Sequence, residues 1–468
     1  MSSEDRYFPP DKKPLLYRLT GIIVRFGLRV FFQRIELRHS GNIPLRGPVL
    51  FVANHPNSIM DALILSAVTR RKVNYLAHAG LFRWKPMAWF LSNCGVIPVH
   101  RRSDEPEKMD QNVQAFAACY EKLEAGEAIG IFPEGTSDML RKVKKVKTGA
   151  ARIVLETEQR NGYDLGVALI PVGLHFFSRS RFRSRVLVNF GEAVPLIKFF
   201  TMYDNDPVAG VRMLTEEIQR RLETLTVNIR EDELDRFVRE IEFLYRDELR
   251  TVDRVASKST IEEFVISQKI AECVQYYQAH HPDRVAAMQE RITEYRRKLD
   301  RLHLRDAMLR ENQSKATITR DMLRVAGIGL AGLLPALYGA ANNLIPYLIS
   351  EGFARMYLHE RTKILTALLI GGGLAFVIFY AAQIALIAHF FSWPWAMIYG
   401  LSLPLGGFFA LAYVQRMRKY RQRVGFSFFL FTNKHLVVKM RRQRKELIAT
   451  MNQVRDEYLS LQSAGATR

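Results

Sequence analysis

The sequence predicts an α/β domain, a mixed sheet flanked by helices, followed by a helical hairpin and C-terminal membrane helices. Short apolar runs alternate with helical patterns from residue 48 to about 200, and charged helical patterns occupy 207–322. Residues 364–415 contain no Asp, Glu, Lys or Arg. Strands interleaved with helices are typical of a sheet covered by helices. The uncharged run is long enough for about two bilayer crossings at roughly 20 residues each.

The N-terminal region, residues 1–45, predicts an amphipathic helix over 14–36. Arg18, Arg25 and Arg29 are separated by 7 and 4 positions, so they share one helical face, and Leu, Ile and Phe occupy the rest. This pattern is typical of a helix in the membrane interface, and an amphipathic helix packed on the domain is the alternative. The polar first residues do not resemble a secretory signal.

Six apolar runs predict the strands of the sheet domain, which we place at 46–205. They are PVLFVA, VNYLAH, CGVIPVH, AIGIFP, VALIPVGLHF and RVLVNFGE. Apolar runs of this length, bounded by turn residues, are typical of buried strands. Residues 105–125, which end before Gly126, and the segment TGAARIVLETEQ predict helices between the strands.

Residues 206–322 predict a charged helical hairpin or a short coiled coil. Apolar residues follow one another at spacings of 4, 3, 4 and 3, which is a heptad-like seam. They are Met288, Ile292, Tyr295, Leu299 and Leu302. If the protein forms a homodimer, this helical region is where we expect the contact.

The membrane region is predicted at 323–415 and a basic tail at 416–468. The run 364–415 turns at SWPW, where a proline breaks the helix and two tryptophans suit the headgroup level. Basic residues flank both ends of this run and are absent from the turn, so the positive-inside rule predicts a hairpin whose ends are cytoplasmic. The catalytic part is then expected on the cytoplasmic face of an integral membrane protein.

An earlier apolar run, 325–349, is interrupted by Pro335, by Asn342 and Asn343, and by Pro346. It either crosses the bilayer or enters and returns. If the N-terminal part is also cytoplasmic, the number of crossings is even, which favours a re-entrant or interfacial segment.

Charge and cysteine content narrow the classes of partner. Lys plus Arg exceed Asp plus Glu by 21, which favours a nucleic acid, an anionic leaflet or phosphate-bearing substrates. The sequence shows no recognition helix and no basic strand interleaved with aromatic residues, which a nucleic-acid-binding protein would carry. We therefore expect no nucleic acid among the partners. Cys94, Cys119 and Cys273 have no paired spacing, so neither a disulfide framework nor a zinc site is expected.

The segment VANHPNSIMDALI, residues 52–64, is the first candidate for chemistry. His55 precedes Pro56, which pushes it out of the helical region of backbone space. Two residues six apart on one helix point about 240° apart, so His55 and Asp61 meet only across a strand-to-helix turn. Ser58 to Asp61 also reads as a capping box that starts a helix without catalysis. The functional alternative is a general base, His55, whose ring is held by Asp61.

Two further segments carry charged residues at strand ends. In GVIPVHRR, Arg101 offers a planar fork to a phosphate, although an arginine there is usually solvated. In IFPEGTSD, Glu134 is placed to hold substrate hydroxyls and Gly135 to let a ligand approach the backbone. A plain Pro-Glu-Gly turn is the alternative. The basic run 141–147 reads as a solvated loop or as a patch for anionic lipid and phosphates.

Four motifs in this order, NHPNSIMD, GVIPVHR, FPEGTSD and LIPVGL, resemble those of the glycerolipid acyltransferase family. This PlsC-like family contains the glycerol-3-phosphate and 1-acylglycerol-3-phosphate acyltransferases, and the resemblance covers about residues 45–200. It implies that His55 is the general base and that Asp61 orients it. The residues implied to bind the acceptor are Arg101, Glu134, Gly135, Thr136 and Lys147. Those implied to line the acyl-donor side are Ile170, Pro171, Val172 and Gly173.

The first motif departs from the common form, because five residues instead of four separate His55 from Asp61. The longer form resembles a branch that includes fungal glycerol-3-phosphate and dihydroxyacetone-phosphate acyltransferases, which also carry C-terminal membrane segments. The acceptor therefore stays open among glycerol 3-phosphate, dihydroxyacetone phosphate, 1-acylglycerol 3-phosphate and another lysolipid.

The activity implied by the resemblance is O-acyl transfer in phospholipid synthesis. Acyl-CoA or acyl-carrier protein is the implied donor, and membrane lipids of an anionic leaflet are the implied partners. No cofactor or metal is expected, because a thioester is already activated. The alternatives are a lysophospholipid remodelling acyltransferase, a CoA-independent transacylase, and a non-enzymatic lipid-binding scaffold that uses the helical region and the basic tail.

Overall fold

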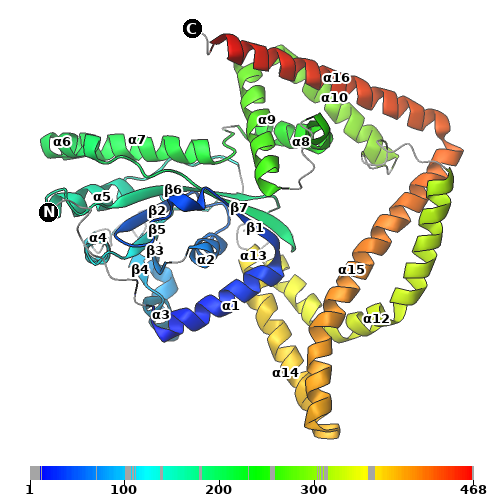
Figure 1. Ribbon diagram of the computed structural model, residues 1–468, viewed down its shortest axis with the longest axis horizontal. Coiled ribbons are helices and arrows are strands. Elements are labelled where there is room, and N and C mark those ends of the chain that lie inside the picture. Colours follow the sequence, from blue (N-terminus) through cyan, green and yellow to red (C-terminus); the bar gives the residue numbers. More distant parts are fainter. Residues whose placement is uncertain are drawn as a thin grey trace. The chain divides into compact units, whose positions relative to one another are not determined.

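The computed structural model describes most of the chain from Asp11 to Gly465 (Figure 1). Outside the description lie residues 1–10, 12, 70, 101–106, 108–109, 111, 138–140, 179–181, 230, 253–258, 303, 305, 307–308, 310–314, 357–363 and 466–468. The chain divides into two compact units. The sheet unit comprises Met1–Asp235, Lys258–Gln268 and Tyr357–Leu369, and the helical unit comprises Arg236–Ser257, Lys269–Met356 and Ile370–Arg468.

The sheet unit is built on a seven-stranded sheet in the order β1-β7-β6-β2-β5-β3-β4. The strands are β1 (Phe32–Arg38), β2 (Val49–Ala53), β3 (Val73–His78), β4 (Val96–Val99), β5 (Ala128–Ile131), β6 (Ala168–Phe176) and β7 (Ser184–Phe190). β2 pairs in parallel with β5 and β6, and β3 pairs in parallel with β5 and β4. β6 and β7 are antiparallel. The sheet is therefore mixed, as the sequence predicts, and all six predicted strands form.

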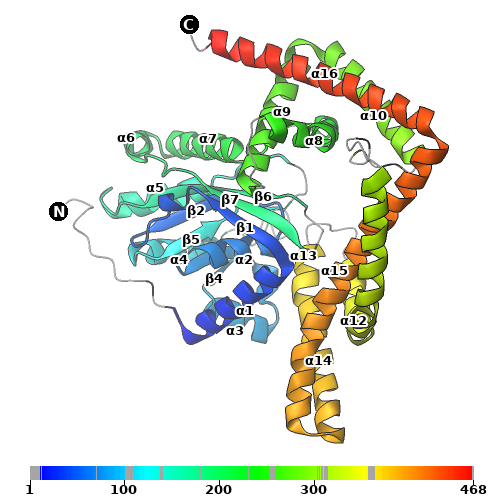
Figure 2. The same ribbon diagram turned by 45° about the vertical axis from the view of Figure 1, so that its right-hand side comes forward.

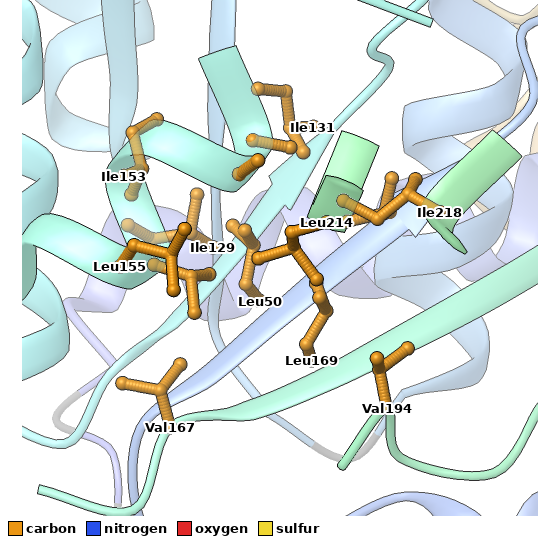
Figure 3. Close-up of a cluster of buried hydrophobic side chains, with 14 of the residues drawn as sticks. Leu50, Ile129, Ile131, Ile153, Leu155, Val167, Leu169, Val194, Leu214 and Ile218 are labelled. Atoms are coloured by element: carbon orange, nitrogen blue, oxygen red, sulfur yellow. The ribbon is translucent and has the colours of Figure 1, made fainter. Parts of the chain in front are cut away.

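Helices cover both faces of the sheet. They are α1 (Leu15–Phe31), α2 (Ile59–Val68), α3 (Lys85–Asn93), α4 (Asn112–Glu124), α5 (Gly149–Arg160), α6 (Ile197–Asn205), α7 (Pro207–Leu225) and the short α13 (Ile364–Ala367). The alternation of strand side chains explains the two layers. Leu50 and Val52 of β2 join a core with residues of α4, α5 and α7 (Figure 3). Phe51 and Ala53 join a second core that includes α1 and α2.

Two elements differ from the sequence interpretation. The helix predicted over 14–36 ends at Phe31, and residues 32–38 form the strand β1, which pairs in parallel with β7. The segment FQRIELR has the alternation of a strand, but the arginines at helical spacing before it favour a longer helix. α7 lies within the range 206–322 that the sequence predicts as a separate helical region, yet its Leu214, Ile218 and Leu222 are buried in the core of the sheet unit.

The helical unit contains most of two helices, α8 (Asp232–Val252) and α9 (Thr260–His280). Five further helices belong to it as a whole: α10 (Pro282–Arg301), α12 (Lys315–Met356), α14 (Gly373–Phe390), α15 (Trp393–Thr432) and α16 (Lys434–Gly465). The predicted seam of α10 buries Ile292, Tyr295 and Leu299. α16 packs beside it, since the buried Asp306 accepts hydrogen bonds from Tyr295, at 2.8 Å, and from Arg444 of α16, at 3.0 Å.

Three helices among the described residues are long and apolar enough to cross a membrane. They are Ala326–Met356, Leu368–Phe390 and Trp393–Arg418. The predicted turn at SWPW forms, because α14 ends at Phe390 and α15 begins at Trp393. α12 contains Pro335 and Pro346 in its interior, and it is bent in both Figure 1 and Figure 2. Interior prolines are the usual cause of such bends.

Candidate active site

The candidate residues gather at the carboxyl edge of the parallel strands. β2 leads into Asn54 and His55, and its neighbour β5 leads into Phe132, Pro133 and Glu134. Because parallel strands end at the same edge, the first and third motifs are brought together there. Ligands in open α/β sheets bind outside this edge.

His55 and Asp61 form the predicted pair. Nδ1 of His55 lies 2.9 Å from Oδ2 of Asp61, whose side chain is fully buried, while the His55 side chain is 14% exposed. A carboxylate accepts hydrogen bonds and does not donate them, so Nδ1 carries the proton. This tautomer leaves Nε2 of His55 free of the proton, as a general base requires.

The turn between β2 and α2 makes this contact. Ser58 has φ 53° and ψ −135°, and α2 begins at Ile59. The backbone N–H of Asn57 donates to Oδ2 of Asp61 at 2.7 Å. The capping box read from the sequence does not form, since the Ser58 side chain makes no cap hydrogen bond and the carboxylate of Asp61 holds Asn57 and His55 instead. Five intervening residues are accommodated because Ser58 takes a positive φ.

Glu134 connects the turn after β2 to the basic run 141–147. Its Oε1 accepts the backbone N–H of His55 at 3.0 Å, and its Oε2 accepts the backbone N–H of Lys144 at 3.3 Å. The side chain is buried, and burial raises the pKa of Glu134 although both N–H groups act against it. Both oxygens of this carboxylate therefore bind the protein backbone.

Gly135 and Lys147 lie against one another. Gly135 has φ +72°, and a Cβ added there would lie 2.5 Å from Nζ of Lys147. The backbone N–H of Lys147 donates to the carbonyl of Pro133 at 2.9 Å, which fixes the basic run beside the third motif. Nζ of Lys144 donates to Oγ1 of Thr136 at 3.3 Å. Two lysines and a hydroxyl therefore lie beside the third motif.

The remaining predicted residues are placed less directly. Arg101 lies outside the described residues. Ile170, Pro171, Val172 and Gly173 are in β6, beside β2. Ile170 and Val172 belong to the core, and a Cβ on Gly173 would lie 2.2 Å from the carbonyl oxygen of Leu225. The role of these four residues on the acyl-donor side stays a prediction.

An apolar cavity of about 920 Å³ opens beside His55. α1, α2, α3 and β3 enclose it, with Val24, Ala62, Leu76, Phe90 and Leu91 among its lining residues. The cavity runs along β3, whose six residues are separated by five steps of roughly 3.3 Å and so span about 17 Å. His55 and Phe132 stand with His78 at the carboxyl end, and Tyr17 accepts the N–H of Val73 at the amino end, at 3.3 Å.

Two contributors were missed by sequence reasoning. The side-chain amide of Asn54 binds both backbone groups of Leu174: Oδ1 accepts its N–H at 2.7 Å, and Nδ2 donates to its carbonyl at 3.1 Å. This clamp ties the end of β2 to β6. The ring of Phe132 stacks on His55 with centroids 4.3 Å apart. Asn54 stands in the quoted motif, and an amide directly before a candidate base was the available signal.

Comparison with known proteins finds a similarity to acyltransferases in the part of the chain that carries this site. Residues 34–175 match the family model described as Acyltransferase. The predicted resemblance is confirmed: the chain is similar to the glycerolipid acyltransferase family, and the curated proteins that match are named glycerol-3-phosphate O-acyltransferases and 1-acyl-sn-glycerol-3-phosphate acyltransferases.

Individual relatives are similar over different parts of the chain. Glycerol-3-phosphate O-acyltransferase 1 of Saccharomyces cerevisiae is 22% identical over 84% of this chain and 64% of its own length. Glycerol-3-phosphate O-acyltransferase 2 of the same yeast is 33% identical over 26% of this chain and 16% of its own length. The chain therefore spans less than two thirds of either yeast protein.

Two bacterial proteins also match. The 1-acyl-sn-glycerol-3-phosphate acyltransferase of Borreliella burgdorferi is 26% identical over 45% of this chain and 82% of its own length. The crystal structure of the 1-acyl-sn-glycerophosphate acyltransferase PlsC from Thermotoga maritima matches with 23% identity and a TM-score of 0.32, over 45% of this chain and 80% of that chain.

Among the described residues, no group of three or more His, Cys, Asp or Glu side chains is placed to hold a metal ion.

Proposed function

We propose that this protein is a membrane O-acyltransferase that moves an acyl chain from a thioester donor to a hydroxyl group of a glycerol phosphate. One observation carries the proposal: the His55–Asp61 pair stands at the carboxyl end of an apolar cavity of about 920 Å³. A base for the hydroxyl and a space for an acyl chain are thereby adjacent.

In the proposed reaction, Nε2 of His55 takes the proton of the acceptor hydroxyl as its oxygen attacks the thioester carbonyl. Asp61 keeps the ring in the required tautomer and stabilises the imidazolium that forms. When the carbon–sulfur bond breaks, the imidazolium returns the proton to the departing sulfur. The products are an ester and a free thiol, and the base is regenerated. General-base assistance typically contributes about 10²–10⁴ in rate.

The anionic end of the acceptor is proposed to bind beside Gly135. The Lys147 ammonium lies over this glycine, and α5 begins two residues later, at Gly149, without a side-chain cap at Thr148. The free N–H groups of a helix N-terminus and a neighbouring lysine together favour a phosphate. From the resemblance, Arg101 is proposed to contribute a further cation.

The acyl chain is proposed to lie in the cavity along β3, and the thioester at its carboxyl end beside His55. Acyl-CoA or acyl-carrier protein is the proposed donor. The net charge of +21 favours either one, because both carry phosphate groups.

We test the reaction with membranes that contain the full chain, supplied with palmitoyl-CoA and one acceptor at a time. The panel is glycerol 3-phosphate, dihydroxyacetone phosphate, 1-acylglycerol 3-phosphate and lysophosphatidylcholine. Free thiol is expected to appear with at least one glycerol phosphate and not with lysophosphatidylcholine, since Lys147 faces a phosphate end that the choline ester masks. Labelled product identifies the acceptor.

Two results would contradict the proposal. Thiol release with lysophosphatidylcholine alone would indicate remodelling, and acyl transfer without thiol release would indicate a transacylase. Lys147→Ala is expected to raise KM for the preferred phosphate acceptor about tenfold, because it removes a charge-assisted contact. Lys145→Ala, two positions away, is the matched control, because Lys145 is also exposed.

The three apolar helices are proposed to make two crossings. Residues 259–268 and 364–369 belong to the same compact unit, and α12 contains the one candidate span between them among the described residues. A compact domain lies on one side of a bilayer, so α12 enters the membrane and returns. Its interior prolines permit the bend. α14 and α15 then form the crossing hairpin.

The helical unit supports the same count independently. Tyr277 of α9 donates to Glu457 of α16 at 3.2 Å, and Arg284 of α10 pairs with the same carboxylate at 2.9 Å. These helices precede and follow all three candidate spans, so the chain between them crosses an even number of times. With the basic flanks, the positive-inside rule favours the cytoplasmic face for the catalytic domain.

Labelling of single cysteines from either side of sealed vesicles tests this topology, after replacement of the three native cysteines. His280→Cys, Met356→Cys and Ser460→Cys are expected to react from one side, because they precede α12, end it and follow the hairpin. Ser392→Cys, between α14 and α15, is expected to react from the other side. Reaction of Met356→Cys on the side opposite to His280→Cys would show that α12 crosses.

A further inference from the structure

The wall of the apolar cavity contains three hydroxyl groups that the proposed reaction does not use. They belong to Tyr17 of α1, Ser66 of α2 and Tyr75 of β3, and all three residues line the cavity. We call them the hydroxyl trio. Oγ of Ser66 donates to the hydroxyl of Tyr75 at 3.1 Å, and Ser66 is also hydrogen-bonded to the hydroxyl of Tyr17. Placing hydroxyls in apolar surroundings is unfavourable, and phenylalanine and alanine would fill the same space without that penalty.

The hydrogen bonds of the trio leave one donor over. Each hydroxyl has one hydrogen to donate, and its oxygen can also accept. Since Ser66 donates its hydrogen to Tyr75, the hydrogen bond between Ser66 and Tyr17 uses the hydrogen of Tyr17. The oxygen of Tyr17 accepts the backbone N–H of Val73 at 3.3 Å. The hydrogen of the Tyr75 hydroxyl therefore has no acceptor within the trio.

The trio is separated from the reacting atoms by an aromatic ring. β5 lies between β2 and β3 in the sheet, and Phe132 follows β5 directly. The ring of Phe132 stacks on His55 and on Tyr75, with centroids 4.3 and 6.1 Å away. A thioester carbonyl beside His55 is thus out of reach of Tyr75, whereas a chain that runs along β3 towards Val73 passes this hydroxyl.

We propose that the hydroxyl trio binds a hydroxyl group on the distal part of the acyl chain, so that the donor carries a hydroxyacyl chain. The hydroxyl of the chain accepts the hydrogen of Tyr75 and donates its own hydrogen to an oxygen of the trio. An unsubstituted saturated chain has no acceptor for Tyr75. This inference rests on the proposed function, because it takes the cavity as the site of the acyl chain.

A positional series of hydroxystearoyl-CoA donors tests the inference in membranes that contain the full chain. Each donor carries one hydroxyl, on successive carbons from the thioester to the end of the chain, and stearoyl-CoA is the reference. Donors hydroxylated over one stretch of the distal half are expected to give kcat/KM about two- to tenfold above stearoyl-CoA, the effect of one hydrogen bond. Hydroxyls on the carbons nearest the thioester are expected to give no such increase.

Tyr75→Phe is expected to abolish this preference, because the ratio of kcat/KM for the favoured hydroxyacyl donor to that for stearoyl-CoA falls to one or below. Ser66→Ala removes the donor that orients the Tyr75 hydroxyl and is expected to reduce the ratio at least twofold. Tyr120→Phe is the matched control. Tyr120 is also buried, but it belongs to the core on the other face of the sheet, so the ratio is expected to stay unchanged.

Two outcomes would overturn the inference and leave the acyl-transfer proposal standing. One is an equal kcat/KM for stearoyl-CoA and every hydroxylated donor, and the other is a preference that Tyr75→Phe retains. Absence of thiol release with all donors would instead contradict the proposed function.

A binding measurement then decides the inference without acyl transfer. The favoured distal hydroxystearate, found by scanning the positional isomers as free acids, is expected to raise the Tm of the full-length protein in detergent more than stearate does. Tyr75→Phe is expected to remove the difference. Equal shifts of Tm for stearate and every hydroxystearate would contradict a hydroxyl-binding site in the cavity.

Discussion

His55→Ala is expected to lower kcat for acyl transfer by about 10²–10⁴, the range that general-base assistance contributes. The acceptor hydroxyl then has no base within reach, since Asp61 is fully buried behind the ring. KM for the acceptor is expected to change little, because its phosphate end is held elsewhere. Single-turnover thiol release in reconstituted vesicles measures the chemical step.

Asp61→Asn tests the other half of the pair. An amide in this position offers an N–H to Nδ1 of His55 and so favours the wrong tautomer. We expect a loss comparable to that of His55→Ala, and the double variant is expected to lose little more than either single one, because the two residues act as a unit. His39→Asn replaces an exposed histidine of the same unit and is the control. Full activity of His55→Ala would exclude it as the base.

The carboxyl-edge site follows from the sequence because buried parallel strands are continuous apolar runs. Every residue of Val49–Ala53 is buried, and the strand therefore appears in the sequence as an unbroken apolar run. Pro56 indicates the turn that follows it. The parallel pairing of β2 with β5 then brings the first and third motifs together. This part of the site needed only local patterns.

Contacts between a side chain and a distant backbone were not predictable in the same way. Asn54 and Leu174 are 120 residues apart, and Glu134 and His55 are 79 apart. Nothing in local periodicity distinguishes a carboxylate that binds a substrate from one that accepts two backbone N–H groups. The sequence therefore predicts Glu134 as a candidate site residue, but it does not predict the two backbone N–H groups that the carboxylate accepts.

The second large effect is expected from Glu134→Gln. Each oxygen of Glu134 accepts one backbone N–H, from His55 and from Lys144. A glutamine has a single acceptor oxygen, and its amide nitrogen must face the other N–H. A buried donor left without an acceptor costs about 1–3 kcal/mol, and the turn that carries His55 is expected to shift to relieve it. If the same cost is added to the activation free energy, kcat falls by roughly 10–100-fold.

The division between kcat and KM decides what Glu134 does. If it positions His55 through the backbone, kcat falls and KM for the acceptor changes little. If it binds acceptor hydroxyls, as the family resemblance implies, KM rises strongly. Glu127→Gln is the matched control, since this partly buried glutamate precedes the same strand at its other end and accepts hydrogen bonds from Asn74 and Lys122. A large rise in KM for Glu134→Gln with unchanged kcat would restore the substrate-binding role.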